Sequence, residues 1–303
     1  MLDGIKAITG KKPLFVQLDL RDKKGVIDFF KTHNDHSGVI HFAASKAVGE
    51  SVHNPLLYYE NNLNSLIYVL QALQKQKASN FIFSSSCTVY GEPDQLPITE
   101  TAPIKKAQSP YGNTKQIGEE IISDTCKVIK TLNAVSLRYF NPIGAHESVE
   151  IGELPIGTPQ NLVPFITQTA IGKRAELSVF GDDYPTEDGT CIRDYIHVVD
   201  LAKAHVAALK RLNNSWNTTN YEVFNIGTGK GASVLEVIKT FERVSGEKLK
   251  FKIVDRRVGD STESYADTTK ATNILGWKAK LSLNDALSSA WKWEQQLNKK
   301  ENT

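Results

Sequence analysis

The chain has 303 residues, of which 40% are hydrophobic and 23% are charged, a composition typical of a globular protein with a sizeable core. Its 36 Lys and Arg residues and 34 Asp and Glu residues leave a formal net charge of +2, and they are mixed along the chain. We therefore expect no nucleic-acid partner, because nucleic-acid binders concentrate basic residues on one face or segment.

Three cysteines, Cys87, Cys126 and Cys191, lie far apart and form no Cys-x-x-Cys pair. They predict neither a disulfide framework nor a zinc site. No run of about 18 apolar residues predicts a membrane span, and Met1 to Lys12 lacks the apolar core of a signal peptide. We expect a cytoplasmic protein that needs no metal and has no membrane partner.

The first half of the chain alternates short apolar runs with longer amphipathic stretches. The predicted elements, in order, are strand Leu14–Leu18, helix Asp22–His33, strand Val39–Ala43, helix Pro55–Gln74, strand Asn80–Ser84, helix Ser109–Lys130 and strand Ala134–Tyr139. This rhythm indicates an α/β fold with a doubly wound parallel sheet that helices cover on both faces.

After Phe140 the sequence becomes rich in Gly and Pro, which indicates a domain junction. Beyond it we predict helices Leu162–Gly172, Val198–Leu212, Ser233–Ser245 and Leu283–Leu297, and strands Leu177–Phe180, Glu222–Ile226 and Lys250–Val254. The predicted dinucleotide-binding domain comprises residues 1–140 and 191–230. The predicted smaller α/β substrate domain comprises residues 141–190 and 231–303.

The strongest chemical signal is Tyr111 followed by Lys115. Ser109 and Pro110 precede them as a good N-cap and a favourable first helical residue, so both side chains lie on one face of a helix start. An ammonium and the helix dipole would lower the pKa of the phenol and make it a general base. Alone, this spacing is common by chance and favours a solvated helix face over a catalytic pair. Ser86, at the end of a predicted strand, could hydrogen-bond the phenol and a substrate hydroxyl.

Several segments together carry a resemblance to a known family. They read IHFAASKAVGESV, FIFSSSCTVYG, SPYGNTK, LRYFNPIGAH, FGDDYPTEDGTCIRDYIHVVDLA and FNIGTGKG. The chain resembles the extended short-chain dehydrogenase/reductases, which have a Rossmann-like fold, and among them the UDP-glucose 4-epimerase family. The resemblance runs from about Asp19 to the C-terminal helix. It implies an isomerase of galactose metabolism that uses NAD to epimerise UDP-hexoses at C4 through a 4-keto intermediate, as a homodimer.

The resemblance also assigns roles to residues of this chain. Tyr111 would take the proton of the sugar 4-hydroxyl, with Lys115 and Ser86 as its catalytic partners. The implied cofactor-binding residues are Asp19, Leu20, Ala43, Ala44, Lys46, Asn61, Ser84, Tyr111, Lys115 and Tyr139. The implied substrate-binding residues are Lys46, Ser86, Phe140, Asn141, Asn161, Leu162, Val179, Phe180, Arg193, Tyr195, Val234, Arg257, Asp260 and Ser264.

One family feature has no counterpart in the sequence. The family begins with a strand and a Gly-x-x-Gly-x-x-Gly turn, and no such spacing occurs here. We therefore expect the chain to lack the first βαβ unit, roughly forty residues by the size of such a unit. This leaves an inactive fragment or a non-catalytic remnant as an alternative to the epimerase, although the intact Ser86, Tyr111 and Lys115 argue against it.

Two further alternatives stay open. A nucleotide-sugar 4,6-dehydratase would carry Asp-Glu after the Thr that follows the serines, where this chain has Val89 and Tyr90. The stretch from Gly227 to Ala232 matches a permissive dinucleotide-binding pattern and could be mistaken for the cofactor turn.

Ser264 aligns with a family position that faces the sugar 2-substituent, and its small size predicts that UDP-N-acetylhexosamines are accepted as well.

Overall fold

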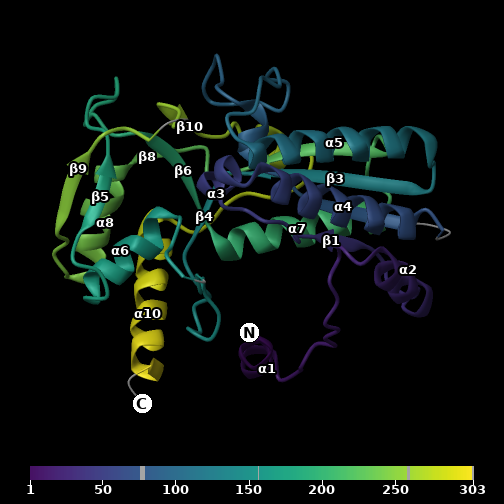
Figure 1. The fold of residues 1–303 in the computed structure, drawn as a ribbon, viewed down its shortest axis with the longest axis horizontal. Coiled ribbons are helices and arrows are strands. Elements are labelled where there is room, and N and C mark those ends of the chain that lie inside the picture. Colours follow the sequence, from purple (N-terminus) through teal and green to yellow (C-terminus); the bar gives the residue numbers. More distant parts are fainter. Residues whose placement is uncertain (76–78, 156, 258–259, 302–303) are drawn as a thin grey trace.

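The computed structural model describes residues 1–75, 79–155, 157–257 and 260–301. Its main sheet has four parallel strands in the order β1-β2-β3-β7. These strands are β1 (Val39–His41), β2 (Ser79–Ser84), β3 (Leu132–Tyr139) and β7 (Tyr221–Ile226). Parallel neighbours need long crossover connections, and here helices supply them. The predicted α/β class is confirmed (Figure 1).

Helices pack on both faces of this sheet. On one face lie α2 (Lys23–Thr32), α4 (Pro55–Leu73) and α5 (Pro110–Val128), whose apolar residues share a core with Phe81 and Phe83 of β2. On the other face lies α7 (Val198–Asn213), which packs with Val135 and Leu137 of β3. The short helices α1 (Leu2–Thr9), α3 (Val48–His53) and η1 (Cys87–Tyr90) complete this part of the chain.

The smaller unit forms around a second sheet. Its strands are β4 (Asn141–Ile143), β6 (Ile192–His197), β8 (Gly231–Ser233) and β10 (Glu263–Ser264), with β6 paired to the other three. A separate parallel pair joins β5 (Leu177–Phe180) and β9 (Phe251–Val254). Helices α6 (Leu162–Ala170), α8 (Val234–Ser245) and α10 (Leu283–Glu301) pack against these strands around Phe241 and Trp291.

The packing bears on where the two units meet. Strand β6 falls in the predicted dinucleotide-binding segment 191–230, yet it pairs with β4, β8 and β10 of the smaller unit. Conversely, Ala271 of α9 (Thr269–Asn273) and Trp277 pack with α7 and the main sheet. These contacts favour a division in which the chain passes between the two units more often than the predicted domain limits allow.

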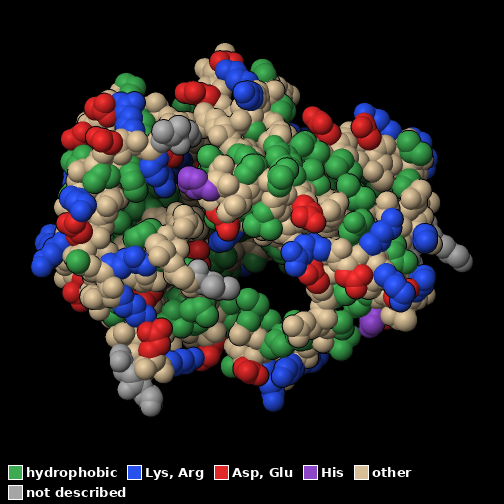
Figure 2. All heavy atoms as spheres, viewed as in Figure 1, with side chains coloured by type: hydrophobic (Ala, Val, Ile, Leu, Met, Phe, Trp, Pro, Cys, Tyr) green, Lys and Arg blue, Asp and Glu red, His purple; other side chains and the backbone are tan. Residues whose placement is uncertain are grey.

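The predicted strand Leu14–Leu18 is wrong. Residues 14–17 have no strand or helix assignment, and Leu14, Phe15 and Val16 expose 83%, 62% and 45% of their surface. A strand needs a hydrogen-bonded neighbour, and within the described ranges β1 pairs only with β2. Figure 1 shows the N-terminal segment that includes α1 running apart from the main sheet, and Figure 2 shows an opening between this segment and the rest of the molecule.

In the described ranges, no helix is both long and apolar enough to cross a membrane.

Candidate active site

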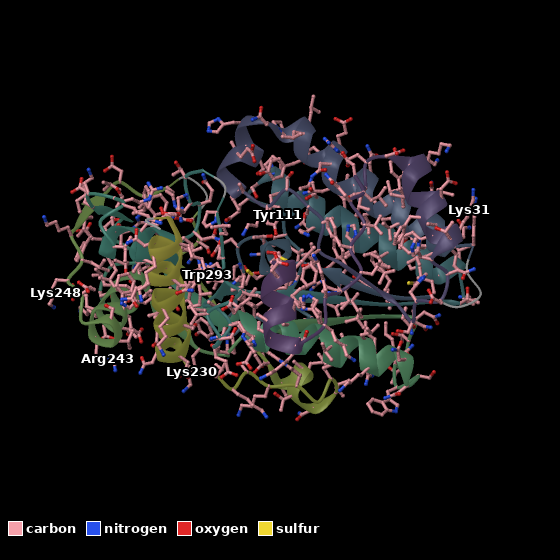
Figure 3. The ribbon with its side chains drawn as sticks, turned by 90° about the horizontal axis from the view of Figure 1, so that it is seen from below. Lys31, Tyr111, Lys230, Arg243, Lys248 and Trp293 are labelled. Atoms are coloured by element: carbon pink, nitrogen blue, oxygen red, sulfur yellow. The ribbon has the colours of Figure 1, made fainter. Side chains whose placement is uncertain are left out.

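The proposed catalytic tyrosine lies at the start of α5. Ser109 caps this helix by accepting a hydrogen bond from Gly112 N at 3.1 Å, and Pro110 occupies the first turn. The cap fixes Tyr111 in the first turn and Lys115 one turn later. Figure 3 shows Tyr111 near the middle of the molecule, between the main sheet and the side that carries Trp293 and Arg243.

Lys115 is almost fully buried, with 4% of its surface exposed. Its Nζ donates a hydrogen bond to Ser84 O at 2.7 Å and lies 4.8 Å from the centre of the Phe83 ring and 5.8 Å from that of Tyr111. Burial lowers the pKa of Lys115 to about 8, and the nearby Glu119 carboxylate opposes this shift. The ammonium therefore remains mostly protonated at neutral pH.

The Tyr111 phenol behaves differently from the expectation. Burial, followed by the neighbouring Tyr139, raises its pKa above the ordinary value, while a hydrogen bond with Ser86 opposes the shift. The expected lowering by Lys115 is not seen, because the ammonium turns toward Ser84 O and the phenol loses solvent. Burial therefore favours the neutral phenol form of Tyr111 in this structure.

The serine turn after β2 connects these groups. Ser86 caps η1 by accepting a hydrogen bond from Thr88 N at 3.2 Å. The Ser84 hydroxyl lies 2.5 Å from the Tyr139 hydroxyl at the end of β3. The carboxyl ends of two adjacent parallel strands thus meet the start of α5, where an open α/β sheet binds its ligands.

The other predicted cofactor residues fall into two groups. Asn61 Nδ2 donates to Ser45 Oγ at 2.8 Å, which ties α4 to the turn that carries Ala43, Ala44 and Lys46. Asp19, by contrast, is exposed and paired with Arg21 at 2.7 Å, and this pairing lowers its pKa to about 2. Leu20 packs against the core beneath α2 and α4. Within the described ranges, no hydrogen bond or ion pair joins Asp19 or Leu20 to Lys115.

Four of the predicted substrate residues form a polar cluster in the smaller unit. The Asp260 carboxylate accepts a hydrogen bond from Arg257 Nε at 2.9 Å and lies 3.7 Å from Arg193 Nη2. The Arg257 guanidinium lies 4.8 Å from the centre of the Phe180 ring. Ser264 of β10 lies opposite Arg193 of β6 in the register of these two parallel strands. Two arginines that share one carboxylate suit a diphosphate, because guanidinium groups bind phosphate bidentately.

Other predicted substrate residues lie in apolar clusters or in the first positions of strands and helices, and their substrate role stays a prediction. They are Phe140, Asn141, Leu162, Val179, Tyr195 and Val234. Asn161 occupies the N-cap position of α6 without a capping bond from its side chain, which donates instead to Glu153 at 3.2 Å. Lys46 lies 3.5 Å from the same carboxylate. Glu153 thus joins two predicted site residues from different units, which its own sequence context gave no reason to expect.

The glycine-rich turn after β7 binds an internal carboxylate. Asp194, fully buried, accepts hydrogen bonds from Thr228 N at 2.8 Å, Gly229 N at 3.1 Å and Ala266 N at 3.2 Å, and from the Thr228 hydroxyl at 2.6 Å. An anion of the protein occupies the place that a phosphate would take in a cofactor turn. The turn is therefore a structural feature.

Among the described residues, no group of three or more His, Cys, Asp or Glu is placed to hold a metal.

Sequence reasoning missed two buried groups beside Lys115. His41, at the end of β1, is 4% exposed, and burial together with the Lys115 charge lowers its pKa to about 4. Glu119 is 7% exposed and lies four residues after Lys115 on α5. The spacing of one helical turn was the signal that could have identified Glu119.

Comparisons with known proteins agree with this geometry. The model of the family described as GDP-mannose 4,6 dehydratase matches residues 4–290, and the chain belongs to that broad family. UDP-glucose 4-epimerase of Drosophila melanogaster is 49% identical over 97% of this chain and 84% of its own length. The chain belongs to the UDP-glucose 4-epimerase family. This relationship favours the epimerase interpretation over a 4,6-dehydratase or a remnant.

Comparison with solved structures gives the same family and supports the fold as well. UDP-glucose 4-epimerase from Stenotrophomonas maltophila, solved with NAD and formylated UDP-arabinopyranose, has a TM-score of 0.94 at 46% identity and covers 99% of this chain and 88% of its own. The UDP-Glc/GlcNAc 4-epimerase from Campylobacter jejuni has a TM-score of 0.80 at 37% identity and covers 97% and 87%. The Rossmann-like fold of the epimerase family is therefore confirmed.

Proposed function

We propose that this chain interconverts UDP-glucose and UDP-galactose by NAD-dependent epimerisation at C4. The observation that carries the proposal is the buried set of Tyr111, Ser86 and Lys115, in which a phenol, a hydroxyl and an ammonium converge. Proton transfer to and from a sugar hydroxyl requires such a set. Membership in the epimerase family supports the same reaction.

The residues around Lys115 fit a nicotinamide dinucleotide. An ammonium has three N–H groups, and among the described residues Lys115 donates a hydrogen bond to Ser84 O alone, so it can also donate to ribose hydroxyls. Asn61, Ser84 and Tyr139 offer amide and hydroxyl groups beside it. When bound, NAD would supply the hydride acceptor and donor that oxidation and reduction at the sugar C4 require. The glycine turn at Asp194 takes no part.

The protein's own groups would handle the proton. The Tyr111 oxygen receives the proton of the sugar 4-hydroxyl and returns it after the sugar has turned over as a 4-keto intermediate. The group that accepts this proton is the Tyr111 phenolate, which becomes a neutral phenol as it does so. Ser86 would orient the oxygen, and the Lys115 ammonium, 5.8 Å from the centre of the Tyr111 ring, would favour the phenolate against the burial that raises the pKa of Tyr111.

The smaller unit would hold the nucleotide sugar. Arg193 and Arg257 are proposed to release part of their pairing with Asp260 and to bind the diphosphate. Ser264 is proposed to admit a 2-acetamido group, so the substrate range extends to UDP-N-acetylhexosamines. The similarity to a UDP-Glc/GlcNAc 4-epimerase supports this extension.

The test of the function is conversion of UDP-galactose to UDP-glucose by the 303-residue chain with NAD supplied, followed by proton NMR of the anomeric signals. We expect conversion by the wild type and at least about a hundredfold loss in Tyr111→Phe, since the proton acceptor is removed. A stable 4-keto-6-deoxy product, or equal rates in both proteins, would refute the proposal.

We also propose that the protein is cytoplasmic and forms a homodimer. Light scattering after gel filtration would test the dimer.

A further inference from the structure

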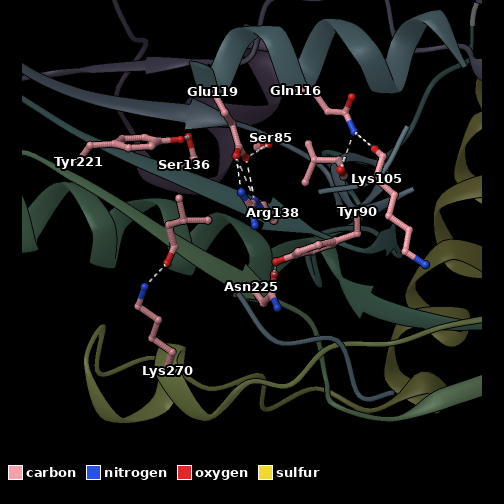
Figure 4. A network of polar contacts seen from close by, with 12 residues as sticks. Ser85, Tyr90, Lys105, Gln116, Glu119, Ser136, Arg138, Tyr221, Asn225 and Lys270 are labelled. Carbon is pink, nitrogen blue, oxygen red and sulfur yellow. Dashed lines mark hydrogen bonds and ion pairs between the residues drawn. The ribbon is translucent and has the colours of Figure 1, made fainter. Parts of the chain in front are cut away.

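A buried ion pair lies directly beneath the serine turn of the site. Arg138 on β3 donates to the Glu119 carboxylate from Nε at 2.9 and 3.2 Å and from Nη2 at 2.5 Å. Both side chains are less than a tenth exposed. The Arg138 guanidinium also lies 4.8 Å from the centre of the Tyr90 ring. Figure 4 shows this network between α5 and the sheet.

The pair is linked to the turn through one hydroxyl. Ser85, fully buried, donates to Glu119 Oε1 at 2.5 Å. The two neighbours of Ser85 in sequence act on the catalytic side chains: Ser84 O accepts a hydrogen bond from Lys115, and Ser86 counteracts the rise in the pKa of Tyr111. A shift of Ser85 would therefore move both partners of the catalytic side chains.

The same carboxylate acts on Lys115 through its charge. Glu119 raises the pKa of Lys115 against burial, which alone would favour the neutral amine. Two other titratable groups lie beside Lys115: His41 on β1, whose pKa the Lys115 charge lowers, and Tyr111 on α5 itself, whose ring centre is 5.8 Å from Lys115 Nζ. Glu119 is the neighbour whose charge raises the pKa of Lys115 and so favours its protonated form.

We propose that Glu119 is a positioning residue of the active site, which holds the serine turn against Tyr111 and Lys115 through Ser85 and places a negative charge beside Lys115. The inference rests on the proposed function for its kinetic consequence. A buried ion pair often contributes little net stability, so a pair placed directly beneath a catalytic turn is better explained by the geometry that it fixes than by folding energy.

The chain offers a matched control at the other end of the sheet. Arg211 donates to the buried Glu222 from Nε at 2.7 Å and from Nη2 at 2.9 Å, and the Thr218 hydroxyl donates to the same carboxylate at 3.2 Å. Glu222 lies near the amino end of β7, away from the strand ends that form the site. Thr218→Ala thus removes a hydroxyl from an equivalent pair without touching the active site.

The first experiment compares Ser85→Ala with Thr218→Ala. We expect Ser85→Ala to lower kcat by about tenfold or more with KM for UDP-galactose changed less than about twofold, because a hydrogen bond to a charged group is lost from the catalytic frame. Thr218→Ala should keep the wild-type kcat. Equal kcat values in the two variants would overturn the proposal, since a merely structural role predicts no difference.

The second experiment does not depend on turnover. Carbon-13 NMR of the lysine Cε atoms, with Lys115→Met used to assign the signal, follows the protonation of Lys115. We expect a midpoint near pH 8 in the wild type. In Glu119→Gln we expect a midpoint lower by roughly one unit, because a negative charge is removed. An unchanged midpoint would overturn the inference. Wild-type inactivity toward UDP-sugars would refute the proposed function instead, and this titration would still decide the inference.

Discussion

Replacing Asp194 tests the finding that the glycine-rich turn serves the fold. Asp194→Ala removes the acceptor of three backbone N–H groups, a buried one on Ala266 and partly buried ones on Thr228 and Gly229. Each buried donor left without a partner costs about 1–3 kcal/mol. Removal of a buried charge and entry of water offset part of this loss, because burial raises the pKa of Asp194 and thus disfavours its charged form. We expect a net destabilisation of about 3–5 kcal/mol.

Urea unfolding followed by circular dichroism measures this change as a shift of the midpoint at constant slope. Asp183→Ala is the control, because Asp183 pairs on the surface with Arg256, and we expect a change within about 0.5 kcal/mol there. A destabilisation by Asp194→Ala as small as that of the control would refute the reasoning. Tighter NAD binding in Asp194→Ala would also contradict it, since it would reveal a phosphate site in the turn.

Three further predictions concern the site and the packing beneath it. Activity should fall as pH rises through about 8, because Lys115 loses its proton there, and a pH profile of kcat that stays flat to pH 9.5, well above that value, would contradict the role of its charge. Ser264→Tyr should lower kcat/KM for UDP-N-acetylglucosamine at least about tenfold while that for UDP-glucose stays within about threefold, and equal losses for both sugars would refute the assignment. Gly118→Ala should destabilise by about 1–3 kcal/mol in the same urea assay, because the new methyl would lie 2.9 Å from Phe83 Cζ, and an unchanged midpoint would show that the ring can move.

Local signals explain what the sequence could predict. The start of α5 follows from Ser109 and Pro110, which act within one helical turn, and α4 ends at Leu73, one residue before the predicted end. Placing Tyr111 and Lys115 on one helix face needed only the helical period. The family motifs then supplied the order of the remaining site segments.

Long-range contacts explain what it could not. Strands β8 and β10 have three and two residues, too few for any periodic signal. The Leu14–Leu18 segment has the composition of a strand, but composition does not provide a hydrogen-bonded neighbour. The Asp194 contacts to Thr228 and Ala266 span 34 and 72 residues, and the direction of the Tyr111 pKa depends on burial that only the folded chain defines.

The central claim is that the sugar C4 is oxidised and reduced again within one site. The most direct test supplies UDP-galactose with deuterium at C4 to the 303-residue chain with NAD, and analyses the UDP-glucose formed by mass spectrometry. The account predicts a product that retains the deuterium at C4, and no product with Tyr111→Phe. Loss of the deuterium to water, or unimpaired conversion by Tyr111→Phe, would contradict it.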